Sequence, residues 1–397
     1  MTAHGRSNSL FFRGVEPVSG NQLRLLQSGA EFFPALIAAI DAARAEVHLE
    51  TYIFNDDASA EAVRDALMRA AQRGVQVRLL IDGVGSRDFP AGWLAALQVK
   101  GVSVMVYRPL VNNWRSNPLN LRRLHRKLAV IDARVAFIGG MNLIDDLEPP
   151  ELPAPRLDFS VEVRGPLLVA IHRSAWRLWR LVALTQMQAG AGGPGRMEPS
   201  WPTDGHTRAA YVVRDNLAHR RDIERVYLAA LALARDEIVI ANAYFLPGRR
   251  FRRLLKNAAQ RGVQVHLLTQ GHTDHPFFQT AARALYRDLL AAGVNIYEYP
   301  ASELHAKVAV VDSHWATVGS SNIDPFSLLL AREANIVVDD AAFAHDLRQR
   351  LQQAIGQSVQ LAPADWQRRP WPRRMMSWLA YGGVRLMVGL AGAGRWA

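Results

Sequence analysis

Two stretches of the chain carry the same polar residues at the same spacing. They cover residues 124–142, LHRKLAVIDARVAFIGGMN, and residues 304–322, LHAKVAVVDSHWATVGSSN. Each stretch holds a His, a Lys, an Asp, a Gly and an Asn, at His125, Lys127, Asp132, Gly139 and Asn142 in the first and at His305, Lys307, Asp312, Gly319 and Asn322 in the second. One copy could arise by chance, but two copies with identical spacing indicate a shared chemical task.

The apolar runs inside both stretches predict where these side chains point. Residues 128–131 and 308–311 are apolar and bounded by polar residues, which predicts two buried strands. Because alternate residues of a strand share a face, the His and the Lys of each stretch should point the same way. This pairing suits a phosphate, since Lys supplies a compact charge and His can attack phosphorus or move a proton. Asp132 and Asp312 follow the strands, and we expect them to hold the Lys or the loop in place.

Lysine usage separates the repeated stretches from the rest of the chain. Of 47 basic residues only four are lysines, and two of these are Lys127 and Lys307. A sequence that uses Arg nearly everywhere else keeps Lys where a compact ammonium serves better than a planar guanidinium. The functional interpretation of the repeated stretches is therefore favoured over coincidence.

The duplicated His-Lys-Asp pattern resembles the signature of the phospholipase D superfamily, and the resemblance spans nearly the whole chain. It implies that the His, Lys and Asp of each copy, Asp132 and Asp312 included, belong to the catalytic residues. It implies phosphodiester chemistry without a metal or a cofactor, in which one His attacks phosphorus and forms a phosphohistidine. The other His protonates the departing alcohol and then deprotonates the incoming one. By resemblance the nucleophile is His125 and the acid and base is His305, although the symmetry of the motif leaves the reverse assignment open.

The same resemblance implies a set of supporting residues. The side chains expected to hold the phosphate oxygens are Lys127, Lys307, Asn142 and Asn322, with Ser320 as a further donor and Gly139 and Gly319 beside them. The first copy has Gly140 where the second has Ser320, so a hydroxyl contact is expected from the second half. Asp158 and Glu333 each follow a motif and precede a strand, at positions where family members have an acid that bonds a catalytic His. The alternative is an ordinary acid at the end of a helix or strand.

Beyond the motifs, the chain repeats itself. AAQRGVQVRLL at residues 70–80 returns as AAQRGVQVHLL at residues 258–268, which indicates two related halves. In both halves strands alternate with helices, with helices expected at 30–43, 58–73 and near Trp93, and again at 220–235, 251–261 and 278–292. This alternation predicts an α/β fold of two tandem phospholipase D-like sandwich repeats with mainly parallel sheets. The motif loops should meet at the strand ends, which puts the active site between the halves.

Composition divides the chain into five parts. We expect a leader at residues 1–20 without a signal peptide or membrane span, a first half at 21–189, a linker rich in Gly and Pro at 190–207, a second half at 208–360 and a tail at 361–397. Residues 167–188 predict a helix packed on the body, with membrane contact as a minority alternative. The long segment between Pro109 and His125 is either a surface loop or a lip for a substrate with a lipid tail.

Charge and composition indicate the class of partner. The formal charge is +11, and the absence of Cys excludes disulfides, thiolate metal sites and a Cys nucleophile. Residues 365–397 hold six Arg, one acid and four Trp, which favours an anionic phospholipid membrane over nucleic acid as a partner. Residues 375–394 are mostly apolar but include Arg385, which favours an interfacial or re-entrant segment over a single span. His272 and His275 are expected to be loop residues rather than metal ligands.

The superfamily contains lipid hydrolases, phosphatidyl transferases and nucleases, so the motif alone leaves the substrate open. The stretches LETYIF, IVIANAYFLPG and HWATVGSSNIDPFSL are similar to bacterial cardiolipin synthases of the short type that lacks amino-terminal membrane helices, in particular the B type. This similarity implies phosphatidyl transfer between two phosphatidylglycerol molecules, with release of glycerol, by a peripheral protein on the cytoplasmic face of a bacterial membrane. The alternatives are a phospholipase D-type hydrolase, a transferase that uses phosphatidylethanolamine as donor, a nuclease and a non-enzymatic membrane organiser.

Overall fold

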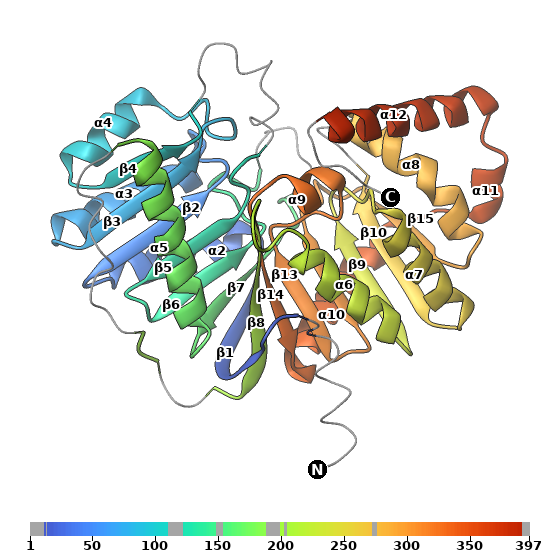
Figure 1. Ribbon diagram of the computed structural model, residues 1–397, viewed down its shortest axis with the longest axis horizontal. Coiled ribbons are helices and arrows are strands. Elements are labelled where there is room, and N and C mark those ends of the chain that lie inside the picture. Colours follow the sequence, from blue (N-terminus) through green and yellow to red (C-terminus); the bar gives the residue numbers. More distant parts are fainter. Residues whose placement is uncertain are drawn as a thin grey trace.

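Two α/β halves form one continuous sheet in the computed structural model (Figure 1). The structure describes residue 12 and residues 14–109, 122–147, 154–187, 199–201, 205–271 and 276–390. Across these residues the sheet has 15 strands, in the order β15-β11-β10-β9-β12-β13-β14-β8-β1-β7-β6-β5-β2-β3-β4. Most of the expected leader, most of the expected linker, the lip at 110–121 and both His272 and His275 lie outside the described residues.

The first half follows the expected alternation of strands and helices. Its elements are β1 (Val18–Gln27), α2 (Ser28–Asp41), β2 (Glu46–Thr51), α3 (Ala58–Gln72), β3 (Gln76–Asp82), α4 (Ala91–Val99), β4 (Ser103–Tyr107), β5 (Lys127–Ile131), β6 (Val135–Gly139), β7 (Phe159–Arg164) and α5 (Leu168–Thr185). The predicted helices at 30–43 and 58–73 therefore correspond to α2 and α3. The strand β1 begins inside the expected leader, at Val18.

The second half repeats this order and adds a carboxy-terminal helix pair. Its elements are β8 (Thr207–Arg214), α6 (Asp222–Leu233), β9 (Glu237–Asn242), α7 (Arg249–Gln260), β10 (Gln264–Gln270), α8 (Pro276–Leu290), β11 (Asn295–Tyr299), β12 (Lys307–Val311), β13 (Trp315–Gly319), α9 (Pro325–Leu329), β14 (Glu333–Asp339), α10 (Ala341–Gly356), β15 (Val359–Gln360), α11 (Pro363–Gln367) and α12 (Trp371–Leu390). The antiparallel pair β1 and β8 joins the two halves in the middle of the sheet.

The α/β class is confirmed, but the expectation of mainly parallel sheets is wrong. Among the described strands, parallel pairing is confined to β2, β3 and β4 and to β9, β10 and β11. The motif strands β5 and β12 return directly into β6 and β13 as antiparallel neighbours. Each return is a tight turn of three residues whose first two have positive φ, Asp132 and Ala133 in the first half and Asp312 and Ser313 in the second. So short a connection allows only antiparallel pairing, whereas a parallel crossover needs a helix.

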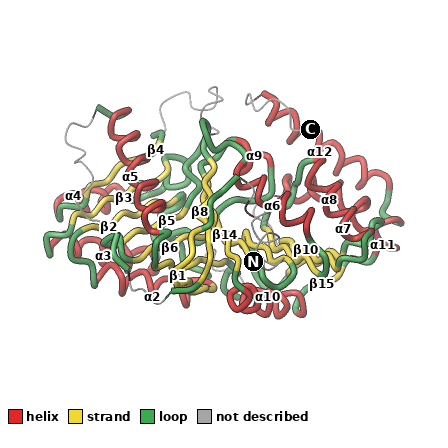
Figure 2. The backbone as a smooth tube through the Cα atoms, turned by 60° about the horizontal axis from the view of Figure 1, so that its bottom comes forward, coloured by secondary structure: helices red, strands yellow, loops and turns green. Residues whose placement is uncertain are grey.

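The motif strands are held by apolar residues on both faces. One face of each strand lies in a single core that both halves share, to which β5 contributes Leu128 and Val130 and β12 contributes Val308 and Val310. The opposite faces of β5 and β12 lie in the separate cores of the first and second half. Figure 2 shows the helices α2 and α10 along one side of the strands. Because the shared core continues across the boundary, it fixes the two motif strands relative to each other.

The carboxy-terminal segment is part of the second half rather than a separate tail. The helix α12 packs along α8, and its residues Ala380, Tyr381, Val384 and Val388 belong to the core of the second half. Phe12, within the expected leader, is buried in the same core. Among the described helices, none combines the length and hydropathy that a membrane span requires.

Candidate active site

Each of the two repeated stretches places its His at the boundary between the halves. His125 and His305 lie two residues before Lys127 and Lys307, the first residues of β5 and β12. The His125 amide donates to the carbonyl oxygen of Arg332 at 3.0 Å, and the His305 amide donates to that of Leu157 at 2.9 Å. Each His backbone is therefore bonded to the other half of the chain. Two segments far apart in the sequence thus build one site.

The carboxylates that contact the two rings are also exchanged between the halves. His125 Nδ1 lies 2.9 Å from Glu333 Oε1, and His305 Nδ1 lies 2.6 Å from Asp158 Oδ2. Glu333 and Asp158 are 0% and 1% exposed. An acid at Nδ1 fixes the ring orientation and leaves Nε2 for the substrate. In the described part of the chain neither Nε2 has a hydrogen-bond partner, and both rings are partly exposed.

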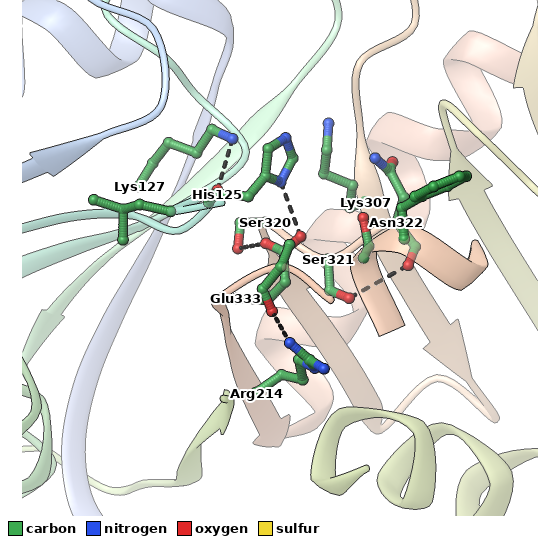
Figure 3. Close-up of polar contacts among 12 residues, drawn as sticks. His125, Lys127, Arg214, Lys307, Ser320, Ser321, Asn322 and Glu333 are labelled. Carbon is green, nitrogen blue, oxygen red and sulfur yellow. Dashed lines mark hydrogen bonds and ion pairs between the residues drawn. The ribbon is translucent and has the colours of Figure 1, made fainter. Parts of the chain in front are cut away.

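The two lysines lie on the same side as the imidazoles, as strand alternation predicted. Lys127 Nζ donates to the carbonyl oxygen of His125 at 2.7 Å, and Lys307 Nζ donates to that of His305. Figure 3 shows His125 between Lys127 and Lys307, with its ring directed at Glu333. Both ammonium groups are buried. The expected shared face of His and Lys is therefore present in both repeats.

Burial and mutual repulsion of cations lower the pKa values of the two histidines and the two lysines of the site. Burial lowers the pKa of His125, opposed by Glu333 and reinforced by Lys127 and Lys307. Burial lowers the pKa of His305 well below its usual value, with Lys307, Arg156, Lys127 and His125 adding to the effect. Burial also lowers the pKa of Lys127 to about 7 and that of Lys307 in the same direction. The lowered pKa values disfavour the charged forms of these basic groups, and the charge of a bound anion would favour them again. This indicates a site for an anion.

The acid that contacts His305 is also affected by burial, which raises the pKa of Asp158 to about 6. A charge on His125 adds to the lowering of the His305 pKa. Because His305 Nδ1 and Asp158 Oδ2 are hydrogen-bonded, the two groups titrate as a pair.

Ser320 supports a carboxylate instead of facing a phosphate. Its hydroxyl donates to Glu333 Oε2 at 2.5 Å and accepts from the Ala334 amide at 3.1 Å. The expected contact of Ser320 with the substrate phosphate is therefore wrong in this structure, because the hydroxyl is buried behind the acid. In the first repeat, a Cβ at Gly140 would lie 2.2 Å from Asp158 Oδ1. Gly140 thus makes room for the shorter acid, which explains the difference between the two copies.

The two glycines of the motif are required by close packing. A Cβ at Gly139 would lie 2.3 Å from Ser160 Oγ, and one at Gly319 would lie 2.2 Å from Asn335 Cγ. Both distances are shorter than van der Waals contact allows. These glycines let neighbouring strands approach, and the structure gives them no contact of their own with the imidazoles.

The two motif aspartates lie away from the lysines, in the turns that follow the motif strands. Asp132 accepts hydrogen bonds from the amides of Arg44, Ala45 and Glu46, at 2.8, 2.8 and 2.9 Å. Asp312 accepts from the three equivalent amides before β9. Of the two expected contacts, with the Lys or with the loop, the structure has only the second. Their inclusion among the catalytic residues is wrong, because each carboxylate is committed to the backbone at the far end of its strand.

The two motif asparagines differ in their contacts. The Asn142 side-chain oxygen accepts from the Ile53 amide at 3.2 Å. The buried side-chain oxygen of Asn322 has no hydrogen-bond partner among the described residues, and the side chain lies beside Lys307 in Figure 3. Their expected contact with phosphate oxygens stays a prediction.

Tyr52 is a residue of the site that the motif analysis missed. Its ring centroid lies 4.9 Å from that of His125, and Lys127 Nζ lies 5.4 Å from the same ring. Tyr52 directly follows β2, and the same position after β9 is Ala243. The signal was available in the sequence, where LETYIF and IANAYF differ at this position. The surroundings of the two imidazoles are therefore unequal.

A second missed feature is the pair of ion pairs that precede the histidines. Arg123 binds Asp82 through Nε at 2.9 Å and Nη2 at 2.8 Å, and Asp82 also accepts from the Leu124 amide. In the second repeat the residue two before the His is Glu303, which binds Arg156 of the first half at 2.8 Å. Both pairs fix the chain just before the His of the repeated stretch. In the part of the chain that the structure describes, no group of three His, Asp or Glu side chains is placed to hold a metal ion.

Comparison with known proteins gives the family. The model of the family described as "Cardiolipin synthase, PLD-like domain" matches residues 36–146 and 227–355. Cardiolipin synthase B of Salmonella typhimurium is 40% identical over 386 residues, with 94% of this chain and 90% of that protein covered. The same enzyme of Escherichia coli is 39% identical over the same span. A phosphatidylserine synthase from Haemophilus influenzae shares the fold, with a TM-score of 0.72, 12% identity and coverage of 98% of this chain and 99% of that chain. The chain belongs to the cardiolipin synthase family with phospholipase D-like domains.

Proposed function

We propose that this protein transfers a phosphatidyl group from one phosphatidylglycerol molecule to another, which yields cardiolipin and glycerol. The observation that carries the proposal is the pair of imidazoles, each bonded at Nδ1 to a buried carboxylate of the opposite half and flanked by a buried ammonium. Such a site neutralises a phosphodiester and supplies both a nucleophile and a proton donor. The 40% identity to a cardiolipin synthase B supports the choice of a lipid substrate.

In the first step His125 Nε2 attacks phosphorus, and the bond from phosphorus to the glycerol oxygen breaks. His305 donates its Nε2 proton to that oxygen, so neutral glycerol leaves. The resulting phosphohistidine carries a positive ring whose Nδ1–H donates to Glu333, 2.9 Å away. Lys127 and Lys307 hold the charge of the non-bridging oxygens.

In the second step His305 removes the proton from a glycerol hydroxyl of a second phosphatidylglycerol. The oxygen attacks phosphorus, the bond to His125 Nε2 breaks, and cardiolipin forms. Two displacements at phosphorus predict retained configuration, whereas inversion would indicate direct attack by the acceptor. Water that replaced the second lipid would give phosphatidic acid.

The electrostatics bear on which His does which task. The low pKa of His305 favours its neutral form in the ligand-free protein, although the first step needs it protonated. A bound phosphodiester offsets the cations that lower this pKa, so substrate binding itself would protonate His305. The reverse assignment, with His305 as nucleophile, differs in which ring carries the phosphoryl group.

Product analysis with labelled phosphatidylglycerol vesicles tests the proposal. We expect cardiolipin and glycerol from the wild-type protein and neither from His125→Asn or His305→Asn. His219→Asn is the matched control, because His219 forms a similar pair with Asp222 at 2.7 Å on the surface. Mainly phosphatidic acid would indicate a hydrolase, and product from phosphatidylethanolamine alone would indicate the other donor. Undiminished activity in either site variant would overturn the two-histidine mechanism.

Mass spectrometry of a quenched reaction identifies the phosphorylated ring. We expect the modified peptide to contain His125, with an intermediate that persists when phosphatidylglycerol is supplied in a smaller amount than the protein, so that little acceptor lipid remains. Modification of His305 instead would exchange the two roles without altering the reaction.

The lipid substrate implies a bacterial membrane as the working surface. We propose peripheral attachment at the cytoplasmic face, supported by the arginine-rich residues 365–397, which suit the anionic inner leaflet. Fractionation before and after a high-salt wash tests this, and resistance to both salt and alkaline carbonate would contradict a peripheral attachment.

A further inference from the structure

The helix α12 exposes apolar side chains where a surface helix normally carries polar ones. Its contact face lies on α8 and includes Ser377, Ala380, Tyr381, Val384 and Val388, all buried. Six large side chains of α12 are at least half exposed, and they are Trp371, Met375, Met376, Trp378, Leu379 and Leu386. All except Met376 gather on one side of the helix, and we call these five residues the apolar stripe.

Helical geometry puts the apolar stripe opposite the contact face. Successive residues turn by about 100°, so residues 371, 375, 379 and 386 fall within about 80° of one another. The centre of this sector is about 180° from the mean direction of the buried residues of α12. A helix packed on a soluble domain has its polar face in this position. The stripe is thus an apolar surface that no described part of the chain covers.

The charges beside the apolar stripe are of one sign. The twenty residues of α12 contain Arg373, Arg374 and Arg385 and no acid. By the same geometry Arg374 and Arg385 lie together along one edge of the stripe. Long Arg side chains at such an edge can reach lipid phosphates while the stripe enters the apolar layer. A second copy of the chain is a poorer occupant, because a symmetric contact across the stripe would bring the same arginines of both copies together.

The apolar surface extends toward the active-site edge of the molecule. A Cβ at Gly383 would lie 3.1 Å from Phe277 at the start of α8, and Phe277 is itself 44% exposed. The helix α8 follows β10, which ends at Gln270. Gln270 occupies the position of Asp82 in the first half, where Asp82 accepts from the amide of Leu124, next to His125. Figure 1 shows α12 and α9 along the same edge of the second half. A bilayer on this edge would lie close to the entrance of the site.

We propose that the apolar stripe of α12 is the surface by which the protein docks on an anionic phospholipid bilayer. The helix lies parallel to the membrane plane, held from behind by α8, with Trp371 and Trp378 at the level of the lipid headgroups. The proposal deepens the proposed function, since it names the surface that brings the site to its lipid substrate.

Vesicle binding by the intact chain tests docking separately from catalysis. The variant Met375→Ser/Leu379→Ser/Leu386→Ser removes the centre of the stripe without touching its contact face. The matched control Val99→Ser/Leu184→Ser/Leu217→Ser removes three apolar side chains that are more exposed than these and lie elsewhere on the molecule. Binding is measured by flotation with vesicles of phosphatidylcholine containing phosphatidylglycerol, and with vesicles of phosphatidylcholine alone.

We expect the stripe variant to bind phosphatidylglycerol vesicles about a hundredfold more weakly, because it no longer buries three large apolar side chains in the bilayer. The control should bind as the wild type does. Arg374→Gln/Arg385→Gln should reduce the preference for the anionic vesicles. In detergent micelles of phosphatidylglycerol, the stripe variant should retain wild-type turnover.

Unchanged vesicle binding by the stripe variant would overturn the proposal. So would a wild-type dimer that the variant abolishes while vesicle binding persists, because the stripe would then serve self-association. Loss of turnover in micelles by a variant with unchanged thermal unfolding would equally overturn it, since the stripe would then belong to the site. Vesicle binding through the stripe without any cardiolipin formation would uphold docking and reject the proposed function.

Discussion

Glu333→Gln isolates the charge behind the proposed nucleophile. Glu333 is fully buried, and its Oε1 lies 2.9 Å from His125 Nδ1. Gln keeps the size and one accepting oxygen but removes the negative charge. The phosphohistidine has a positively charged ring, so its formation loses the attraction of that charge.

The expected magnitude comes from Coulomb's law. Charge centres about 4 Å apart at an effective dielectric constant of about 20 attract by about 4 kcal/mol. Each 1.36 kcal/mol on the barrier is about tenfold in rate, so the full effect is about a thousandfold. Because charge develops only partly in the transition state, we expect kcat to fall between about a hundredfold and a thousandfold, with a smaller change in KM.

The assay is steady-state cardiolipin formation combined with the rate of phosphohistidine formation in a quenched reaction. Glu298→Gln is the control, because the Glu298 carboxylate is also paired with a side chain, Arg283 at 2.9 Å, but lies on β11 away from the imidazoles. A folded Glu333→Gln protein with less than a tenfold loss of kcat would refute the claim that this carboxylate stabilises the charged ring.

Three other perturbations test the roles of single residues. Gly140→Ala places a Cβ 2.2 Å from Asp158, so we expect kcat to fall at least about tenfold. The control Gly92→Ala, with nothing within 4 Å of its Cβ, should leave kcat unchanged. Equal effects of the two substitutions would contradict the steric argument. Burial lowers the pKa of Lys127 to about 7, and a bound phosphodiester raises it, so Lys127 takes up a proton on binding near pH 8, whereas near pH 5 it is already protonated. Calorimetry of glycerophosphoglycerol in buffers of different ionisation enthalpy measures this uptake, and its survival in Lys127→Met would point to another group. Asp132 has a φ of 50° and accepts three hydrogen bonds from backbone amides, which Asp132→Ala removes. We expect urea denaturation to show a free energy of unfolding lower by about 2–4 kcal/mol, with KM unchanged. A changed KM with unchanged stability would indicate that Asp132 belongs to the substrate site.

Local pattern in the sequence carried much of the fold and the site. The apolar runs after Lys127 and Lys307 predicted buried strands, and alternation along a strand predicted that His and Lys share a face. Both features depend on residues within a few positions of one another, where backbone geometry alone decides. The same holds for α3, whose boundaries the periodicity predicted to within about two residues.

Other features depended on contacts between distant segments. The sequence placed Ser320 near a phosphate because it lies in the motif, yet its hydroxyl bonds Glu333 across the β13–β14 pair. It placed Asp132 with the catalytic residues, yet a tight turn carries that carboxylate to the amides before β2. Tyr52 was missed because its contact with His125 joins two strands separated by more than seventy residues.

The sequence by itself determined that the chain is a duplication with two histidines, two lysines and two following acids fit for phosphodiester chemistry. Only the tertiary structure decided that each acid serves the His of the opposite half, because the shared core brings β5 and β7 against β12 and β14. It also decided which face of α12 is packed and which is bare, since an apolar helix has the same sequence pattern whichever side its neighbour occupies. Spacing along the chain sets the direction of a side chain on its own element, while its partner is set by how the elements pack.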